Sequence, residues 1–393
     1  MSKFMFVGAP PSSKSIMNRA LIAKSFSPSL NLNGDSKCDD VRLMYKAIED
    51  LKNGAREFEC GHAGTVLRFL APRLAREKGV FRLNGSTRLF QRPQKSLEKL
   101  LLQLGAIDIQ WTDNSLSFNS DGWRQMGDAL HISAAESSQF LSGVLLSAWE
   151  LPFDLALVLP TEVTSVSYLQ LTLEVLARLG MDLKVTDTEI IVPKSQKVGA
   201  STFNVEPDMS SAFALAVAAV LAGEIRFKGI PDVPLQPDGV FFDILESMGV
   251  DIEYRIKWTR LVKTKKLHGV DVDLSHAPDL FPVLAVLCCF AQGRSRLFGA
   301  EQLRYKESNR ISAVSELLTH LMVRFKELPD GIEIEGPMQI QRIPEFNFDT
   351  QNDHRMAMAA GLLKLAHVPV NIIHPEVVDK SFPEFFSTIG VQN

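Results

Sequence analysis

The feature that most constrains this fold is an internal repeat, in which a helix-like apolar segment ends in an apolar residue followed by glycine. Gly105, Gly180, Gly249 and Gly390 occupy this final position, and Met322 stands there in one further copy. The copies with their apolar residues at helical spacing are 41–54, 97–106, 173–181, 241–250 and 315–323. With the stretch that ends at Gly390, they predict six units of similar length.

Each unit also carries strand signals and a second type of helix. Alternating apolar and polar runs with central turn residues follow several copies of the repeat, at 108–118, 182–192 and 324–336. The second helices are apolar nearly all round, as in SSAFALAVAAVLAG and NDHRMAMAAGLLKLA, so they should be buried. We therefore expect an α/β protein with its most apolar helices inside each lobe and its sheets outside.

The length of 393 residues favours two lobes over one hydrophobic core. Turn-rich stretches at 10–13 (PPSS) and 206–211 (EPDMSS) are candidate crossings between the lobes. The predicted lobes are 13–205, and 1–12 together with 206–393, with three repeat units in each.

The cysteines and the hydropathy favour a cytoplasmic protein with no membrane partner. Cys38, Cys60, Cys288 and Cys289 have no spacing typical of a disulfide framework or a zinc site. No apolar run has the length of a signal peptide or a membrane span. The net charge is only −4, so any affinity for anions must come from local groups of basic residues.

Cations recur at or just before expected helix starts in both halves of the chain. A helix start presents free N–H groups and a positive dipole end, which suits phosphate or carboxylate. Taken singly, each segment could also be an ordinary N-cap or a solvated surface group. The shared placement argues against eight independent surface residues; these are Lys14, Arg19, Arg68, Arg92, Lys306, Arg310, Arg355 and Lys380.

If both lobes direct these helix starts toward one cleft, the cleft binds small polyanions. Asp279 and Glu307 are then the acids left for proton transfer. Short uncharged hydrogen-bonding groups also cluster at helix starts, which suits a hydroxylated or phosphorylated ligand; they are Ser137, Ser138, Gln139, Ser165 and Tyr168.

Ten short motifs occur in the order typical of one family: SKSIMNRAL, GHAGTVLR, QRP, SSQF, SVSY, PDMSSA, APD, YKESNRI, NDHRMAM and DKSFPEFF. With them the chain resembles the EPSP synthase (3-phosphoshikimate 1-carboxyvinyltransferase) family. The resemblance implies two similar lobes, each of three βαβαββ-type units, forming an inverse α/β barrel. It also implies transfer of the enolpyruvyl group of phosphoenolpyruvate to the 5-hydroxyl of shikimate 3-phosphate, by a monomer that needs no metal or cofactor.

The resemblance also implies which residues bind each substrate. Shikimate 3-phosphate would contact Lys14, Ser15, Arg19, Ser137, Ser138, Gln139, Ser165, Asp279, Gln302 and Lys306. Phosphoenolpyruvate would contact Lys14, Gly64, Arg92, Gln139, Arg310, Arg355 and Lys380.

The residue types at these positions fit the chemistry of the reaction that the resemblance implies. Glu307 is the candidate acid that protonates the methylene carbon, and Asp279 is the candidate base that orients and deprotonates the attacking hydroxyl. Lys14 and Lys380 would stabilise the departing phosphate. Arginine forks bind carboxylate and phosphate in bidentate fashion.

Three residues depart from the usual family pattern. His62 replaces an asparagine, Phe69 replaces a proline, and Gln302 replaces an asparagine that contacts the sugar phosphate. We expect these changes to affect substrate affinity and sensitivity to phosphoenolpyruvate-like inhibitors such as glyphosate more than the reaction.

Three other functions remain open from the sequence. A transferase acting on UDP-N-acetylglucosamine shares the donor, but STRLFQRP lacks its characteristic loop cysteine. A nucleic-acid clamp would leave Asp279 and Glu307 unexplained among the cations, and we expect no nucleic-acid partner. A binding protein without catalysis would not need both acids.

Overall fold

The computed structural model describes residues 4–124, 127, 129–132, 137–160 and 166–392. The chain divides into two compact units: unit 1 is Met1–Ser12 with Glu206–Asn393, and unit 2 is Ser13–Val205. The crossings fall at Ser12 and Val205, beside the proline-containing stretches PPSS and EPDMSS. In the part of the chain that the structure describes, no helix is both long enough and apolar enough to cross a membrane.

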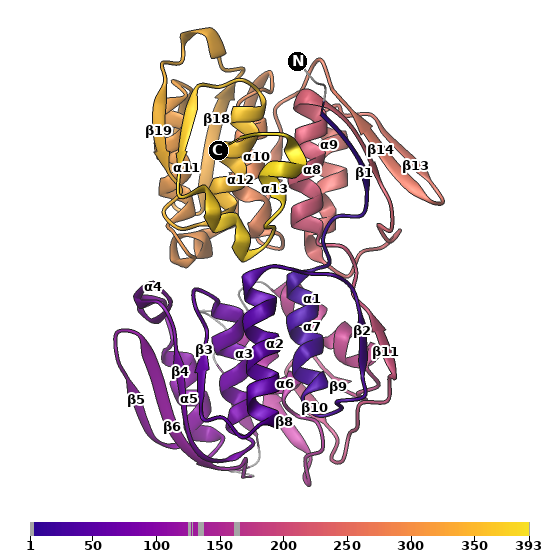
Figure 1. Cartoon of the computed structure of the whole chain (residues 1–393), viewed down its shortest axis with the longest axis vertical. Helices are drawn as coiled ribbons and strands as arrows, with labels where there is room; N and C mark the ends of the chain where they lie inside the picture. Colours follow the sequence, from indigo (N-terminus) through magenta and orange to yellow (C-terminus); the bar gives the residue numbers. More distant parts are fainter. Residues whose placement is uncertain (1–3, 125–126, 128, 133–136, 161–165, 393) are drawn as a thin grey trace. The chain divides into compact units, whose positions relative to one another are not determined.

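Unit 2 consists of helices packed together and bordered by sheets (Figure 1). The more deeply buried helices are α1 (Lys14–Lys24), α3 (Gly64–Leu74) and α6 (Gln139–Leu146). The others are α2 (Asp39–Lys52), α4 (Thr87–Gln91), α5 (Lys95–Gln103) and α7 (Val166–Arg178).

The strands in the described part of unit 2 form three sheets. One has the order β3-β4-β6-β5, from Glu57–Glu59, Lys78–Asn84, Ser115–Asp121 and Ile107–Trp111. A second has the order β7-β8-β10-β9, from Leu130–His131, Leu155–Val158, Glu189–Val192 and Lys184–Val185. The third pairs β11 (Thr202–Asn204) with β2 (Asn31–Asn33).

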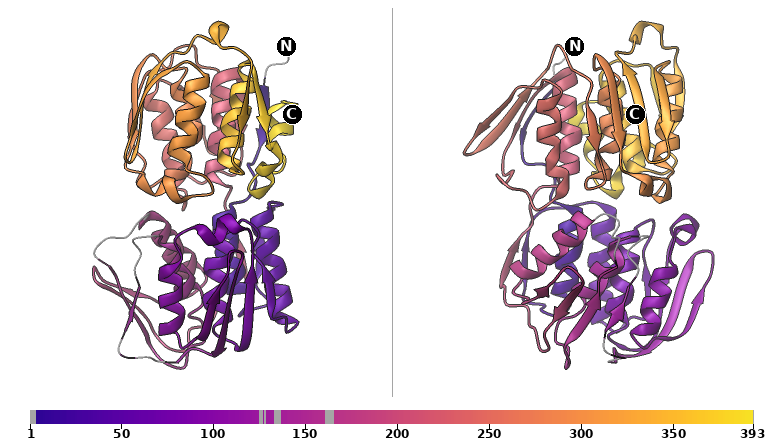
Figure 2. Two further views of the ribbon diagram at one scale, coloured as in Figure 1. Left: turned by 90° about the vertical axis from the view of Figure 1, so that its left-hand side faces the viewer. Right: turned by 180° about the vertical axis from the view of Figure 1, so that it is seen from behind.

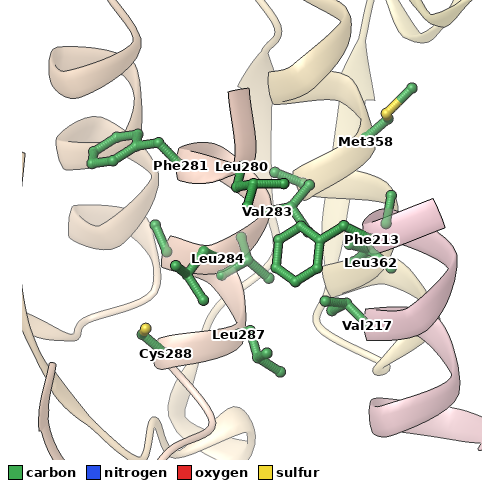
Figure 3. Packing of buried hydrophobic residues seen from close by; sticks show 14 of the residues in the cluster. Phe213, Val217, Leu280, Phe281, Val283, Leu284, Leu287, Cys288, Met358 and Leu362 are labelled. Carbon is green, nitrogen blue, oxygen red and sulfur yellow. The ribbon is translucent and has the colours of Figure 1, made fainter. Parts of the chain in front are cut away.

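Unit 1 repeats this plan. Its buried helices are α8 (Met209–Ala222), α10 (Phe281–Cys288) and α12 (His354–Leu365), and the others are α9 (Phe241–Ser247), α11 (Arg310–His320) and α13 (Phe385–Ile389). The core lies where the three buried helices meet: Figure 3 shows Phe213 of α8 among Val283 and Leu284 of α10 and Leu362 of α12. Short 3-10 helices also occur: η1 (Pro237–Val240), η2 (Pro278–Leu280), η3 (Glu301–Tyr305), η4 (Ile340–Arg342) and η5 (Pro375–Lys380).

Among the residues of unit 1 that the structure describes, the strands also form three sheets. The order β1-β12-β14-β13 comes from Phe4–Gly8, Gly223–Phe227, Trp258–Val262 and Ile252–Arg255. The order β15-β16-β18-β17 comes from Asp271–Asp273, Gly293–Phe298, Gly331–Gly336 and Arg324–Leu328. The third pairs β19 (Phe346–Asp349) with β20 (Val370–Ile373). The hairpin β13–β14 extends away from the helices in Figure 1 and in the right-hand view of Figure 2.

The repeat predicted from the sequence is confirmed by the order of elements. In the complete units a parallel strand pair is followed by an antiparallel hairpin, as in β3 with β4 and then β5 with β6. Two parallel pairs join distant parts of the chain, because β1 pairs with β12 and β11 pairs with β2. Each of these pairs includes one strand next to a crossing between the units.

The glycine position of the repeat ends a helix in the left-handed conformation. Gly105, Gly180 and Gly249 have φ of 89°, 95° and 88°, and Met322 has φ of 53°. In each case the next residue donates its N–H to a carbonyl in the last helical turn, as Val250 does to Leu245 at 3.0 Å and Val323 to Leu318 at 3.2 Å. This is the Schellman arrangement, which favours glycine because a Cβ is strained at positive φ.

Candidate active site

Unit 1 gathers charged side chains at the starts of its helices. Asp279 lies in η2 just before α10, Glu307 precedes α11, and Arg310 is the first residue of α11. Arg355 is the second residue of α12, and Lys380 ends η5. The starts of α11 and α12 are fixed by side-chain caps: Asn309 accepts from the N–H of Ser312 at 3.2 Å, and Asp353 accepts from the N–H of Arg355.

Arg310 is the centre of this charged cluster. Its side chain is 1% exposed, and its Nη1 donates to Asp279 Oδ1 at 2.7 Å. Its Nη2 donates to Glu307 Oε2 at 3.2 Å. Its Nε donates to Asp353 Oδ2 at 2.8 Å, and Nη2 also reaches Asp353 Oδ1 at 3.2 Å. One buried guanidinium therefore joins three carboxylates from three segments of the chain.

Two more cations complete the cluster in unit 1. Arg355 donates from Nη2 to Asp279 Oδ2 at 3.3 Å, so Asp279 bridges the two arginines. Lys380 donates from Nζ to Glu307 Oε1 at 2.6 Å, so Glu307 bridges Arg310 and the lysine. Both predicted acids thus contact predicted phosphoenolpyruvate-binding cations.

The cluster lowers the pKa of one of its acids, Asp279. Burial by itself raises the pKa of Asp279, but the nearby Arg355, Arg310 and Lys306 together hold that pKa well below its usual range. The pKa of Arg310 is raised, since the effect of its three carboxylate neighbours exceeds that of burial. Asp279 is therefore a carboxylate in this state, and a weak base.

Asp353 is the residue of this site that sequence reasoning missed. It is fully buried and N-caps α12, where it accepts from the backbone N–H of Arg355 at 2.9 Å. It also accepts from Ser308 Oγ at 3.1 Å and from Arg310. A signal was present in the motif NDHRMAM, because an acid directly before the start of a helix is a strong N-cap.

Two other predicted residues lie on the segment before Glu307. Gln302 is half-buried in η3, and Lys306 follows η3 directly and is also half-buried. Lys306 is close enough to lower the pKa of Asp279.

Unit 2 holds the other predicted residues, and α1 carries three of them. Lys14, its first residue, forms an ion pair with the buried Asp40 of α2 at 3.1 Å. Arg19 donates from Nη1 to the carbonyl of Ser15 at 2.7 Å and from Nε to Thr172 Oγ1 at 2.8 Å. Burial lowers the pKa of Arg19 to about 10, so this side chain remains a cation at neutral pH.

The departures from the family pattern occupy different environments. Phe69 is fully buried, and the guanidinium carbon of Arg19 lies 5.2 Å from the centre of its ring. The ring of Phe69 therefore packs against the guanidinium of Arg19, a residue predicted to bind shikimate 3-phosphate. His62 is exposed in the turn before α3.

Gln139 and Arg92 meet the start of α3 from two directions. Gln139 donates from Nε2 to Thr65 Oγ1 at 3.2 Å. A Cβ added to Gly64 would lie 2.8 Å from Arg92 Nη1, so the absence of a side chain leaves room for that guanidinium. The structure thus brings together three of the residues predicted to bind phosphoenolpyruvate.

The hydroxyl groups are described in part. Ser137 accepts from the backbone N–H of Gln139 at 3.2 Å, and Ser138 is buried at the start of α6. Ser165 lies outside the described residues. Tyr168 accepts from Arg19 through its backbone carbonyl at 3.1 Å.

The fold and these groups define an α/β protein of six related units, whose helix starts carry arginines, lysines and acids. The sequence model of the family described as EPSP synthase (3-phosphoshikimate 1-carboxyvinyltransferase) matches residues 52–389. A 3-phosphoshikimate 1-carboxyvinyltransferase of Syntrophobacter fumaroxidans is 34% identical over 96% of this chain and 95% of its own length. One from Photobacterium profundum is 31% identical, over 97% of this chain and 94% of its own. This chain belongs to the EPSP synthase family.

A solved structure has the same fold. EPSP synthase from Acinetobacter baumannii superposes with a TM-score of 0.76 at 23% identity, covering 99% of this chain and 95% of that one. The enolpyruvyl transferase NikO from Streptomyces tendae reaches a TM-score of 0.72 at 17% identity, covering 98% and 94%. The predicted two-lobed α/β architecture and the family resemblance are therefore confirmed.

Proposed function

We propose that this protein transfers the enolpyruvyl group of phosphoenolpyruvate to the 5-hydroxyl of shikimate 3-phosphate and releases phosphate, a step of aromatic amino-acid biosynthesis. The observation that carries the proposal is the cluster of Arg310, Arg355 and Lys380, in which each cation contacts Asp279 or Glu307. The names of the curated relatives, which align over nearly the whole chain, support the same activity.

The cations of unit 1 bind the donor in this proposal. The carboxylate and phosphate of phosphoenolpyruvate replace Asp279 and Glu307 as partners of Arg310, Arg355 and Lys380. Arg92 of unit 2 contributes to the same ligand, and Gly64 leaves the space for its guanidinium. Arginine forks match both anionic groups in geometry.

Binding of the donor also changes the pKa of Asp279. While Asp279 contacts both arginines, its low pKa makes it a poor proton acceptor. When a substrate anion neutralises Arg310 and Arg355, the pKa of Asp279 rises toward its ordinary value. Asp279 then becomes a usable base when the donor is present.

The chemistry proceeds through a tetrahedral adduct. Glu307 gives a proton to carbon 3 of the donor, the 5-hydroxyl oxygen bonds to carbon 2, and the hydroxyl proton passes to Asp279. The adduct then loses phosphate from carbon 2 and a proton from carbon 3, which restores the double bond. Lys14 and Lys380 stabilise the departing phosphate.

The acceptor is bound by the uncharged and basic groups that the family resemblance identifies. Arg19, Ser137 and Ser138 of unit 2 bind shikimate 3-phosphate, with Gln302 and Lys306 of unit 1. The hydrogen bonds that hold Arg19 against α7 and the ring of Phe69 fix its side chain in place.

Two further properties belong to this proposal. The protein acts in the cytoplasm, which its four free and buried cysteines support. It works as a monomer, which sedimentation equilibrium of the purified protein tests.

The experiment measures phosphate release from phosphoenolpyruvate with shikimate 3-phosphate or, separately, UDP-N-acetylglucosamine as acceptor. We expect release with the shikimate ester alone, and loss of release in Glu307→Gln and Asp279→Ala. Release with the nucleotide sugar instead would assign another acceptor, and no release with either would refute the proposal.

A further inference from the structure

Arg68 is a predicted cation whose guanidinium contacts other segments of the protein. Its side chain projects from α3 and is almost completely buried, with its guanidinium carbon 4.9 Å from the ring centre of Phe140. Its three nitrogen atoms contact acceptors on two other segments of unit 2. One contact is with Gln139, a predicted substrate ligand, and the others are with Pro93 and Gln94, which follow the predicted ligand Arg92.

The first contact orients Gln139. Arg68 Nη1 donates to Gln139 Oε1 at 3.0 Å, and the amide nitrogen of Gln139 faces Thr65 Oγ1 at 3.2 Å. A guanidinium has only donors, so it fixes the carbonyl end of the amide toward itself. The NH₂ group carries two hydrogens, and one of them is left for a substrate oxygen after the contact with Thr65.

The other two contacts hold the chain on the C-terminal side of Arg92. Arg68 Nη2 donates to the carbonyl of Pro93 at 3.2 Å, and Nε donates to Gln94 Oε1 at 3.2 Å. Gln94 in turn donates to the carbonyl of Leu89 at 3.1 Å. The backbone is thereby fixed on both sides of Arg92.

We infer that Arg68 is a positioning residue of the proposed transferase, which sets the amide of Gln139 and the backbone of Arg92 at the same time. The inference rests on the proposed function. Its basis is that the planar guanidinium of Arg68 donates to three acceptors, on Pro93, Gln94 and Gln139. Pro93 and Gln94 lie in a different repeat unit from Gln139. Lysine cannot reproduce these contacts, because its donors share one nitrogen atom.

The test compares Arg68→Lys with Arg73→Lys in the purified full-length protein. Arg73 is a matched control on the same helix: it is also buried, it donates to Ser25 Oγ and Glu77 Oε1 at 2.7 Å each, and it covers Phe26. Both changes should lower the thermal unfolding temperature. Only Arg68→Lys should raise KM for both substrates, by about tenfold or more, because hydrogen bonds of a charged group are lost.

A second variant separates the two contacts and does not alter Arg68. Gln94→Met removes the link from Arg68 to Leu89 while Gln139 keeps its partner, so KM for phosphoenolpyruvate should rise and KM for shikimate 3-phosphate should not change. This variant decides the question if Arg68→Lys does not fold.

The outcomes separate the inference from the proposed function. If the wild type is active and Arg68→Lys has the same KM values as Arg73→Lys, the inference is wrong while the function stands. Equal changes in both KM values for Gln94→Met would also overturn it. If the wild type does not transfer the enolpyruvyl group, the proposed function and this inference fall together.

Discussion

The buried carboxylate of Asp353 provides the sharpest prediction from unit 1. Asp353→Asn keeps the shape of the side chain and removes its charge. The carboxylate accepts two bonds from Arg310, one from Ser308 Oγ and one from the Arg355 N–H, and it is fully buried. Asparagine keeps one acceptor oxygen and places an NH₂ group against a cation.

The magnitude follows from the burial of both partners. Removing one member of a buried ion pair typically costs about 3–5 kcal/mol. Asp279 and Glu307 also contact Arg310, so they compensate part of its charge and place the expected loss at about 3 kcal/mol, the low end of that range. KM for phosphoenolpyruvate should rise about tenfold or more, because Arg310 loses its fixed orientation.

Urea unfolding and steady-state kinetics check this prediction. Asp349→Asn is a suitable control, because Asp349 is exposed and accepts from the backbone N–H of Gln351. The reasoning is refuted if Asp353→Asn unfolds at the same urea concentration as the control and has an unchanged KM for phosphoenolpyruvate.

Three further predictions concern other positions. Met322→Gly should stabilise the protein by about 1 kcal/mol, since methionine is strained at φ of 53° and the residue is 56% exposed. Gly54→Ala should destabilise the protein, because Gly54 has φ of 81°, although there is open space around it. A change of the thermal unfolding temperature in the opposite direction for either variant contradicts this account. Gly64→Ala should raise KM for phosphoenolpyruvate at nearly unchanged stability, because the three heavy atoms nearest to the new Cβ all belong to the flexible end of Arg92. Unchanged kinetics would refute the contact. Because the pKa of Asp279 is lowered, its ion pairs stabilise the fold above the ordinary carboxyl pKa, and this stabilisation is lost as the pH falls through the lowered pKa. Asp279→Asn should therefore reduce the stability at pH 7 and weaken the dependence of stability on pH in the acid range. An acid range like that of the wild type would contradict this prediction.

The repeat could be predicted from the sequence because it depends on local chemistry. A helix that ends in a Schellman motif requires a left-handed residue and an apolar residue after it, and Gly249 with Val250 satisfies both needs. The exception, Met322, was recognised by its position alone, and the structure gives it the same left-handed backbone.

The pairing of distant strands could not be predicted from local patterns. Strands β2 and β11 have three residues each, too few for a clear alternation of apolar and polar residues. They pair with each other, although they lie near opposite ends of the sequence of unit 2. Strands β1 and β12 have five residues each, but they too are far apart in the sequence, since all of unit 2 lies between them. Register between such segments depends on tertiary packing.

The candidate cations were chosen by residue type and position at helix starts, and the substrate ligands followed from the family resemblance. Neither criterion finds a residue that acts through a distant partner, and this explains what was missed. Asp353 was overlooked because its role depends on Arg310, which lies in another repeat unit. Arg68 was grouped with the ligand-binding cations because its sequence context resembles theirs, yet its contacts with Gln94 and Gln139 are visible only in the structure. Long-range hydrogen bonds of this kind have no sequence period.

Analysis of the reaction product tests the central claim most directly. Purified protein is incubated with shikimate 3-phosphate and phosphoenolpyruvate, and mass spectrometry of the sugar acid is compared with the phosphate released. The account predicts one enolpyruvyl adduct of shikimate 3-phosphate for each phosphate. Phosphate without the adduct would indicate hydrolysis of the donor and contradict the account, as would the absence of both products.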